Sequence, residues 1–257
     1  MNPPIADFSL EGKVAIVTGG SRGIGRSISI ALAQAGADVA IAARKPEALT
    51  EARLAVEATG RRAIEVPTNV RVNEDLRDLV SETQTRLGRV DVLVNNVGTT
   101  PVFGPIQDLE ERAWDVIMNT NVKAAHLLSN AVREAMLEHG EGGSIINVSS
   151  VGGLRASDVI GGYSVSKAAL IMLTQVQAKT WGQDGIRVNA IAPGLIQTDF
   201  ARTLWEDDST RGRAEVEAAL RRIGQPDEMA GAVVYLASPA ASFVTGQTLV
   251  LDGGRLI

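Results

Sequence analysis

Short apolar runs alternate with longer helical patterns along almost the entire chain. Val, Ile and Ala dominate the runs, which carry apolar residues continuously instead of at every second position. This pattern is typical of strands that are covered on both faces. We expect seven strands, at 13–19, 38–44, 63–70, 90–98, 143–150, 186–194 and 247–254. The fold class predicted is α/β, a Rossmann-type doubly wound parallel sheet with helices on both faces.

The segments between these runs carry apolar residues at helical spacing. We expect helices at 24–37, 46–60, 73–88, 109–139 and 163–182. No linker rich in Pro, Ser or charge divides the chain, so residues 1–257 are interpreted as one domain. The polar segment 199–226 interrupts the alternation and is the candidate substrate lid.

Composition excludes several classes of function. The formal net charge of −5 gives no support for binding nucleic acid or an acidic membrane. The chain has no cysteine, which excludes disulfides and thiolate metal ligands, and we expect no metal site. Neither a secretory signal nor a membrane-spanning run is apparent, so a cytoplasmic protein is expected. The two histidines lie far from any nucleophile elbow, which disfavours a Ser-His-Asp hydrolase.

A glycine-rich turn, TGGSRGIG at 18–25, joins the first strand to the first helix. Glycine there permits a tight turn and a close approach of the backbone to a pyrophosphate, next to the N–H groups of the helix N-terminus. The spacing differs from the G-x-G-x-x-G fingerprint, but the position in the chain is the one that this mechanism requires. The candidate cofactor contacts in the turn are Gly19, Ser21, Arg22, Gly23, Ile24 and Gly25.

The end of the second strand indicates which dinucleotide is bound. An acidic residue there would bind a ribose 2′-hydroxyl and repel a 2′-phosphate. This chain has Ala43 instead, followed by Arg44, and the glycine turn adds Arg22. Two guanidinium groups can clamp a phosphate, so the sequence favours NADP(H) over NAD(H).

A tyrosine and a lysine lie four residues apart where the helix after the fifth strand begins. One helical turn brings Tyr163 and Lys167 onto the same face. Ser149 and Ser150 end the preceding strand, at the carboxyl edge where parallel sheets bind ligands. The ammonium favours the phenolate form of Tyr163, which can then exchange a proton with a carbonyl or alcohol oxygen.

Taken together, the motifs resemble those of the classical short-chain dehydrogenase/reductase superfamily, from about Leu10 to Gly254. The matching segments are TGGSRGIG at 18–25, NNVG at 95–98, MNTNVKA at 118–124, SIINVSS at 144–150, YSVSK at 163–167 and APGLIQT at 192–198. The resemblance implies a catalytic group of Asn121, Ser150, Tyr163 and Lys167. In it, Ser150 orients the reacting oxygen, and Asn121 holds a water that links Lys167 to solvent.

The resemblance also implies contacts to a nicotinamide dinucleotide outside the glycine turn. They fall on Asn69, Val70, Asn96, Gly98, Tyr163, Lys167, Pro193, Gly194, Ile196 and Thr198. Two positions depart from the family pattern. Asn69 replaces a common aspartate at the adenine, and Val97 replaces a common alanine beside the cofactor groove.

The sequence thus predicts an NADP(H)-dependent oxidoreductase acting on a ketone or secondary alcohol, of the carbonyl reductase or alcohol dehydrogenase type. A 3-oxoacyl-carrier-protein reductase is the alternative within the family, and a cofactor-binding sensor or scaffold without turnover is the alternative outside it. The substrate should be a small molecule selected by residues 99–107, 151–162 and 199–222. Family members are commonly homotetramers, so we expect a homotetramer, with a homodimer as the alternative.

Overall fold

The computed structural model describes residues 6–257. Residues 1–5 lie outside the described residues. They are part of the N-terminal stretch in which we expect no secretory signal. One parallel sheet of seven strands forms the centre, in the order β3-β2-β1-β4-β5-β6-β7. The strands are β1 (Val14–Thr18), β2 (Asp38–Ala43), β3 (Ala63–Pro67), β4 (Val92–Asn95), β5 (Gly143–Val148), β6 (Ile186–Pro193) and β7 (Thr248–Leu251). The predicted doubly wound sheet and its seven strands are therefore confirmed.

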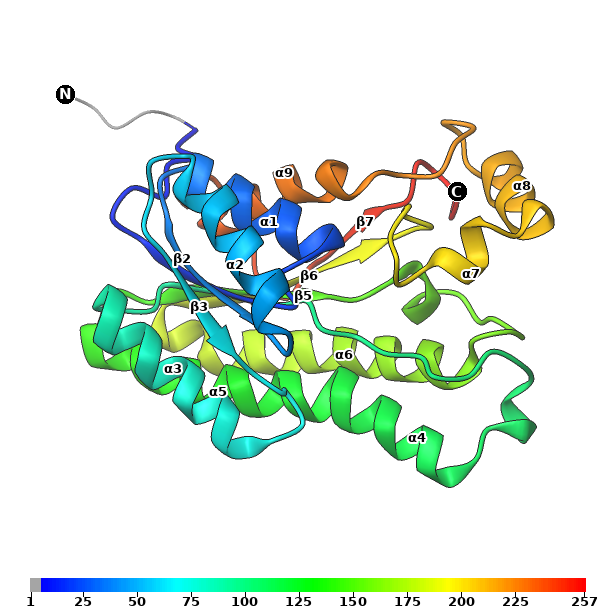
Figure 1. Ribbon diagram of the computed structural model, residues 1–257, viewed down its shortest axis with the longest axis horizontal. Helices are drawn as coiled ribbons and strands as arrows, with labels where there is room; N and C mark the ends of the chain where they lie inside the picture. The colour runs from blue at the N-terminus through cyan, green and yellow to red at the C-terminus, as the bar shows by residue number, and fades with distance from the viewer. Residues whose placement is uncertain (1–5) are drawn as a thin grey trace.

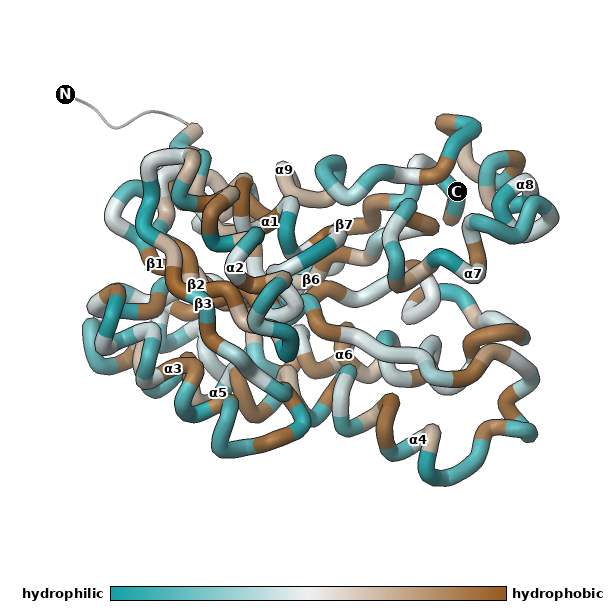
Figure 2. Tube along the Cα trace, in the orientation of Figure 1, coloured by the Kyte–Doolittle hydropathy of each residue, from teal (hydrophilic) through white to brown (hydrophobic). Residues whose placement is uncertain are grey.

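Helices cover both faces of the sheet (Figure 1). They are α1 (Gly23–Gln34), α2 (Pro46–Glu57), α3 (Asn73–Leu87), α4 (Glu111–Met118), α5 (Ala124–His139), α6 (Gly161–Trp181), α7 (Arg202–Trp205), α8 (Asp208–Glu217) and α9 (Ala230–Ala237). Helices α1, α2 and α9 pack on one face, and α3, α5 and α6 pack on the other. Figure 2 shows hydrophobic residues along the strands and hydrophilic residues on much of the outer helical surface.

Burial on both faces explains the continuously apolar strands. In β1, residues Ala15, Ile16 and Val17 are fully buried, and the first and third pack toward the opposite face from the second. Burying such side chains contributes about 25 cal/mol per Å² of apolar surface removed from water. The sheet is therefore the rigid platform on which the loops at its carboxyl edge are positioned.

The chain reverses its winding direction between β1 and β4, which are neighbours in the sheet. In open parallel sheets the crevice at such a switch point, outside the carboxyl ends of the strands, is where ligands bind. The glycine turn follows β1 there, and the NNVG segment follows β4 there.

Two features differ from the sequence expectations. The helical region expected at 109–139 is present from Glu111 to His139, but a π-turn at Asn119–Lys123 interrupts its α-helical hydrogen bonding between α4 and α5. Helix α9 was not predicted, because its sequence AGAVVYLA is apolar almost throughout and shows no amphipathic period. The predicted lid segment 199–226 contains the two short helices α7 and α8.

Candidate active site

The glycine turn is shaped so that its backbone is accessible and tightly folded. Gly19 and Gly23 have positive φ angles of 64° and 51°, which glycine adopts without strain. A Cβ at Gly25 would overlap the carbonyl oxygen of Gly19. Arg22, the N-cap of α1, makes no side-chain cap, which leaves the first N–H groups of the helix free of a side-chain partner. This cradle fits a phosphate group.

Asn96 fastens this turn to β4. Its Nδ2 donates to the carbonyl oxygens of Thr18 at 2.9 Å and Gly19 at 3.3 Å. Its backbone N–H donates to Oγ1 of Thr18 at 3.0 Å. The Asn96 side chain, expected from the resemblance at the adenosine ribose, thus binds the backbone of the turn in this structure.

The second strand ends beside the turn, as predicted. Arg44 follows β2, and Arg22 lies in the turn; both side chains are exposed. Among residues 6–257, neither guanidinium forms a salt bridge with a carboxylate. Both are therefore available to an anionic ligand.

Asn69 and Val70 follow β3 and line a surface hollow of about 390 Å³ with Asn119 and Lys123. The backbone N–H of Asn69 donates to Asp75 at 2.7 Å, and its Oδ1 accepts the backbone N–H of Arg71 at 3.2 Å. The amide oxygen that we expected at adenine therefore has a partner in its own turn.

The predicted catalytic residues come together where β5 meets α6. Nζ of Lys167 lies 5.5 Å from the ring centroid of Tyr163 and donates to the carbonyl oxygen of Val148 at 2.7 Å. The Ser150 hydroxyl lies near enough to the Tyr163 phenol to influence its ionisation, and it accepts the N–H of Gly152 at 3.0 Å. A Cβ at Gly98 would lie 3.3 Å from Nζ of Lys167, so the turn after β4 reaches the same group.

The two serines at the end of β5 have different partners. Oγ of Ser149 is buried and donates to the backbone oxygen of Lys167 at 3.0 Å, which ties β5 to α6. The hydroxyl of Ser150 instead lies beside the phenol. This geometry agrees with the choice of Ser150 as the serine that contacts the reacting oxygen.

Burial dominates the ionisation of the pair. It raises the pKa of Tyr163 to about 12, and the Ser150 hydroxyl, which hydrogen-bonds the phenolate, works in the opposite direction. Burial also lowers the pKa of Lys167 to about 8. We expected the lysine to lower the pKa of the phenol; in this structure desolvation raises that pKa instead.

Asn121 is buried inside the π-turn and connects three segments. Its Oδ1 accepts the N–H of Thr99 at 2.8 Å, and its Nδ2 donates to Oγ of Ser166 at 2.9 Å. Ser166 in turn donates to the backbone oxygen of Tyr163 at 2.7 Å. Single-turn π-bulges in helices are frequent at functional sites, and this one points the amide toward α6. Thr99 and Ser166 were missed from the sequence, although Ser166 is part of the YSVSK motif.

The segment after β6 closes the site. Pro193 ends the strand, Gly194 and Ile196 follow it, and a Cβ at Gly23 would lie 3.4 Å from Cγ2 of Thr198. The residue just before the lid segment therefore lies against the glycine turn. Two residues later, the ring centroid of Phe200 lies 6.0 Å from that of Tyr163, with 41° between the ring planes.

Comparison with known proteins agrees with this geometry. Residues 19–255 match the family model described as "Enoyl-(Acyl carrier protein) reductase". Dehydrogenase/reductase SDR family member 4 of Bos taurus is 40% identical over 247 residues, which are 96% of this chain and 88% of the relative. The chain belongs to the short-chain dehydrogenase/reductase superfamily. It is accordingly an oxidoreductase.

Solved structures of this superfamily superpose closely on the chain. A gluconate 5-dehydrogenase from Burkholderia cenocepacia, in complex with NADP and tartrate, has a TM-score of 0.92 at 34% identity, covering 97% of each chain. A carveol dehydrogenase from Mycobacterium avium, in complex with NAD, has a TM-score of 0.91 at 29% identity, covering 96% of this chain and 98% of its own. The resemblance expected from the motifs is thus confirmed for the family.

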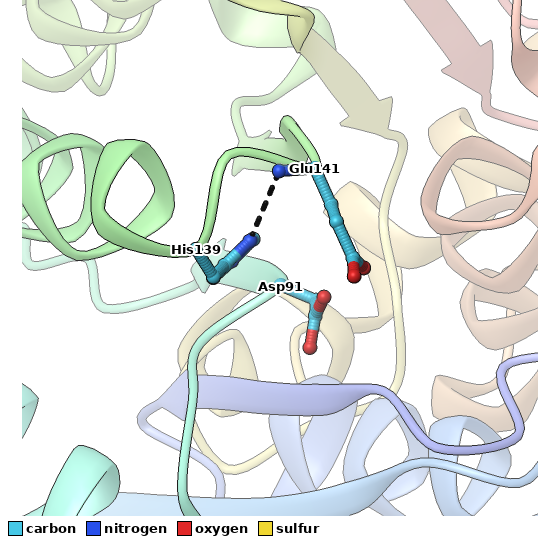
Figure 3. Close-up of side chains that lie close together, drawn as sticks. All are labelled: Asp91, His139 and Glu141. Atoms are coloured by element: carbon cyan, nitrogen blue, oxygen red, sulfur yellow. Dashed lines mark hydrogen bonds between the residues drawn. The ribbon is translucent and has the colours of Figure 1, made fainter.

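At the opposite, amino edge of the sheet, Asp91, His139 and Glu141 lie close together (Figure 3). This is the type of cluster that can bind a metal ion, but its atoms already have partners. Nδ1 of His139 accepts the N–H of Glu141 at 3.2 Å, and Nε2 contacts the carbonyl oxygen of Val90 at 3.0 Å.

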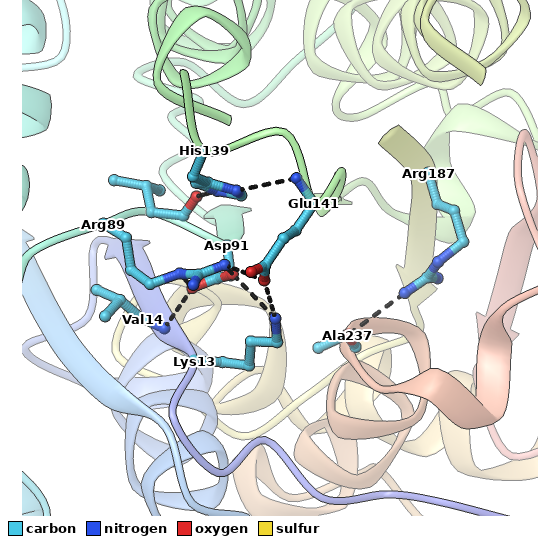
Figure 4. Close-up of polar contacts among 9 residues, drawn as sticks. Lys13, Val14, Arg89, Asp91, His139, Glu141, Arg187 and Ala237 are labelled. Carbon is cyan, nitrogen blue, oxygen red and sulfur yellow. Dashed lines mark hydrogen bonds and ion pairs between the residues drawn. The ribbon is translucent and has the colours of Figure 1, made fainter. Parts of the chain in front are cut away.

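Both carboxylates of this cluster form ion pairs with the side chains of Arg89 and Lys13 (Figure 4). Arg89 donates to Asp91 at 2.6 and 2.8 Å and to Glu141 at 2.6 Å, and Lys13 contacts the same two carboxylates. Hydrogen bonds from Arg89 and Lys13 lower the pKa of Glu141 to about 2. The cluster therefore joins the beginnings of β1, β4 and β5.

Within residues 6–257, no helix combines the length and the apolar character needed to cross a membrane.

Proposed function

We propose that the protein is an NADP(H)-dependent oxidoreductase that interconverts a ketone and a secondary alcohol. The observation that carries this proposal is that the Tyr163 phenol lies near both the Ser150 hydroxyl and the Lys167 ammonium. These groups lie at the carboxyl edge of the sheet, the same edge as the glycine turn. A proton donor and a dinucleotide cradle on one edge are what carbonyl reduction requires.

The roles of the side chains follow from their ionisation. With a pKa of about 12, the phenol of Tyr163 carries its proton at neutral pH and can donate it to a carbonyl oxygen. The hydroxyl of Ser150 binds the same oxygen and fixes its position. Lys167 carries its charge below a pKa of about 8 and stabilises the phenolate that remains.

The cofactor supplies the hydride when it is bound. The contacts proposed for it are those predicted from the sequence, with the glycine turn at the phosphates and Ile196 and Thr198 at the nicotinamide end. The turn supports this assignment because the first N–H groups of α1 have no side-chain cap, and because a Cβ at Gly25 would collide with the carbonyl oxygen of Gly19, so that glycine is needed for the tight fold. Asn96 acts as the residue that holds the turn in shape.

The preference for NADP(H) rests on Arg22 and Arg44, two exposed arginines at the place where a 2′-phosphate would lie. The similar gluconate 5-dehydrogenase was solved with NADP, and the similar carveol dehydrogenase with NAD. Arg44→Ala should raise the KM for NADPH about tenfold or more and leave the KM for NADH nearly unchanged, because one charged phosphate contact contributes about 1.5–3 kcal/mol. A wild-type protein that prefers NADH would overturn this part of the proposal.

A screen of cofactor oxidation across neutral ketones, 3-oxoacyl thioesters and quinones tests the activity itself. Turnover of ketones supports the carbonyl reductase, whereas selective turnover of oxoacyl thioesters supports a 3-oxoacyl-carrier-protein reductase. The description of the matched family model names an enoyl and not a 3-oxoacyl substrate, but it shares the acyl carrier protein with this second candidate. Cofactor binding without turnover of any class would instead indicate a sensor or scaffold.

We further propose that the segment 199–226 acts as the substrate lid of a single-domain enzyme. Glu217, at the end of α8, supports this role by binding Arg155, from the loop after β5, at 3.5 Å and Arg255, near the C-terminus, at 2.8 Å. The lid is thus held by exposed or half-buried ion pairs, which contribute little stability and break at low cost.

The oligomer proposed is a homotetramer in the cytoplasm, with a homodimer as the alternative. Its support is the exposed apolar stripe on α6, formed by Val165, Met172 and Val176. Light scattering that gives the mass of a monomer would contradict this proposal.

A further inference from the structure

Phe200 lies on the catalytic tyrosine, in the first residues of the lid. The two ring centroids are 6.0 Å apart at a 41° angle, a separation at which aromatic rings attract each other. Phe200 nevertheless remains 48% exposed, whereas Tyr163 is only 9% exposed. Phe200 therefore packs beside the Tyr163 ring and still leaves about half of its surface free to meet another molecule.

The position of Phe200 is fixed by hydrogen bonds of its neighbours. Nε1 of Trp205 donates to the carbonyl oxygen of Thr198 at 2.8 Å. The N–H of Ala201 donates to Oγ1 of Thr198 at 3.3 Å, and α7 begins at the next residue, Arg202. These hydrogen bonds fix the conformation of the turn that carries Phe200 at the start of the lid.

Two further loops bring exposed apolar side chains to this side of the sheet. The N–H of Gly104 donates to the carbonyl oxygen of Val159 at 2.8 Å, which joins the loop after β4 to the loop after β5. The exposed apolar residues in the two loops are Val102, Phe103, Ile106, Leu154 and Val159. Large apolar side chains that gather in exposed loops indicate a binding surface.

We propose that Phe200 is a specificity-determining residue whose free surface packs against a flat apolar ring attached to the carbonyl carbon of the substrate. A carbonyl oxygen that reaches the Tyr163 hydroxyl brings its substituents close to Phe200, because the two rings are in contact. The chain should therefore prefer aryl or cyclic ketones over small aliphatic ones. This inference rests on the proposed function and names its substrate class.

The test compares kcat/KM for acetophenone and for 2-butanone, each measured with NADPH and with NADH. The wild type should favour acetophenone. Phe200→Ala should lower the acetophenone/2-butanone ratio about tenfold, the usual scale for losing one apolar contact in a pocket. Phe200→Tyr keeps the ring and should keep the ratio within about twofold, by the same reasoning.

Phe243→Ala is the matched control, because Phe243 is fully exposed in the turn after α9 and has no place in the site. Its ratio should equal that of the wild type. Phe200→Leu provides a second variant if Phe200→Ala folds poorly, and it should lower the ratio in the same direction.

The outcomes separate the two proposals. A wild type that reduces neither ketone with either cofactor contradicts the proposed function. A wild type that reduces ketones but favours 2-butanone, or whose ratio is the same after Phe200→Ala and Phe200→Leu, overturns the role of Phe200 and leaves the proposed function standing.

Discussion

Nζ of Lys167 lies over the ring of Tyr163, 5.5 Å from its centroid, and donates its hydrogen bond to the carbonyl oxygen of Val148. The ammonium is thus held at the end of β5 and acts on the phenol across the ring. Because both groups are buried, water screens the charge on Lys167 only weakly, and this charge favours the phenolate that forms when Tyr163 gives up its proton.

The pH dependence of ketone reduction should reveal the ionisation of Lys167. Burial lowers the pKa of Lys167 to about 8, so its positive charge is present below that pH and is lost as the pH rises through it. We expect kcat/KM for ketone reduction to be level near pH 7 and to fall above about pH 8. In Lys167→Met the activity should be low and this fall absent. A wild-type profile that stays level to pH 10 would contradict the assigned role.

Asn121 should be needed for both stability and turnover. Asn121→Ala removes a buried amide that binds Thr99 and Ser166, which leaves polar groups without partners. We expect the free energy of unfolding to decrease by about 1–3 kcal/mol, measured by denaturant titration. Turnover should fall about 100-fold, because Ser166 holds the backbone of Tyr163 and misplacement costs rate steeply.

Asn130→Ala is the control for this variant. Asn130 is an amide on α5 whose side chain forms an exposed hydrogen bond with His126 at 3.3 Å. Its stability should stay within about 0.5 kcal/mol of the wild type. Equal effects of the two substitutions would argue against the special position of the π-turn.

The glycine turn gives a prediction about cofactor affinity. Gly25→Ala places a Cβ against the carbonyl oxygen of Gly19 and the amide of Asn96, so the turn must open. The Kd for NADPH, measured by fluorescence titration, should rise about 100-fold, equivalent to about 2.7 kcal/mol. Gly182→Ala, at the end of α6 with φ −57° and an open Cβ position, should leave the Kd unchanged.

Much of the fold was predictable because burial leaves a direct trace in the sequence. Strands such as β1 are apolar and buried along most of their length, and the glycine turn follows β1 at the switch point of the sheet, where open parallel sheets bind ligands. Helix α9 escaped prediction for the same reason, since it packs Val233 and Leu236 into the core and lacks a polar period.

The residues of the candidate site were predictable from the sequence, whereas their pKa values and tertiary contacts were not. Tyr163 and Lys167 were recognisable from their spacing and Ser150 from the resemblance to the superfamily, but the desolvation that raises the pKa of the phenol depends on tertiary packing. The π-turn around Asn121 shifts the helical hydrogen bonds by one residue, and no local sequence pattern indicates such a shift. Contact between Phe200 and Tyr163 joins positions 37 apart and required the folded chain.

The most direct test of the account is single-turnover ketone reduction by Tyr163→Phe in its preformed complex with NADPH. The variant keeps the ring and its contacts but lacks the proton, so cofactor affinity and thermal stability should match the wild type. The rate of NADPH oxidation should fall about 1,000-fold, within the range of general acid catalysis. A rate within about tenfold of the wild type, which that range excludes, would contradict the assignment of Tyr163 as the proton donor.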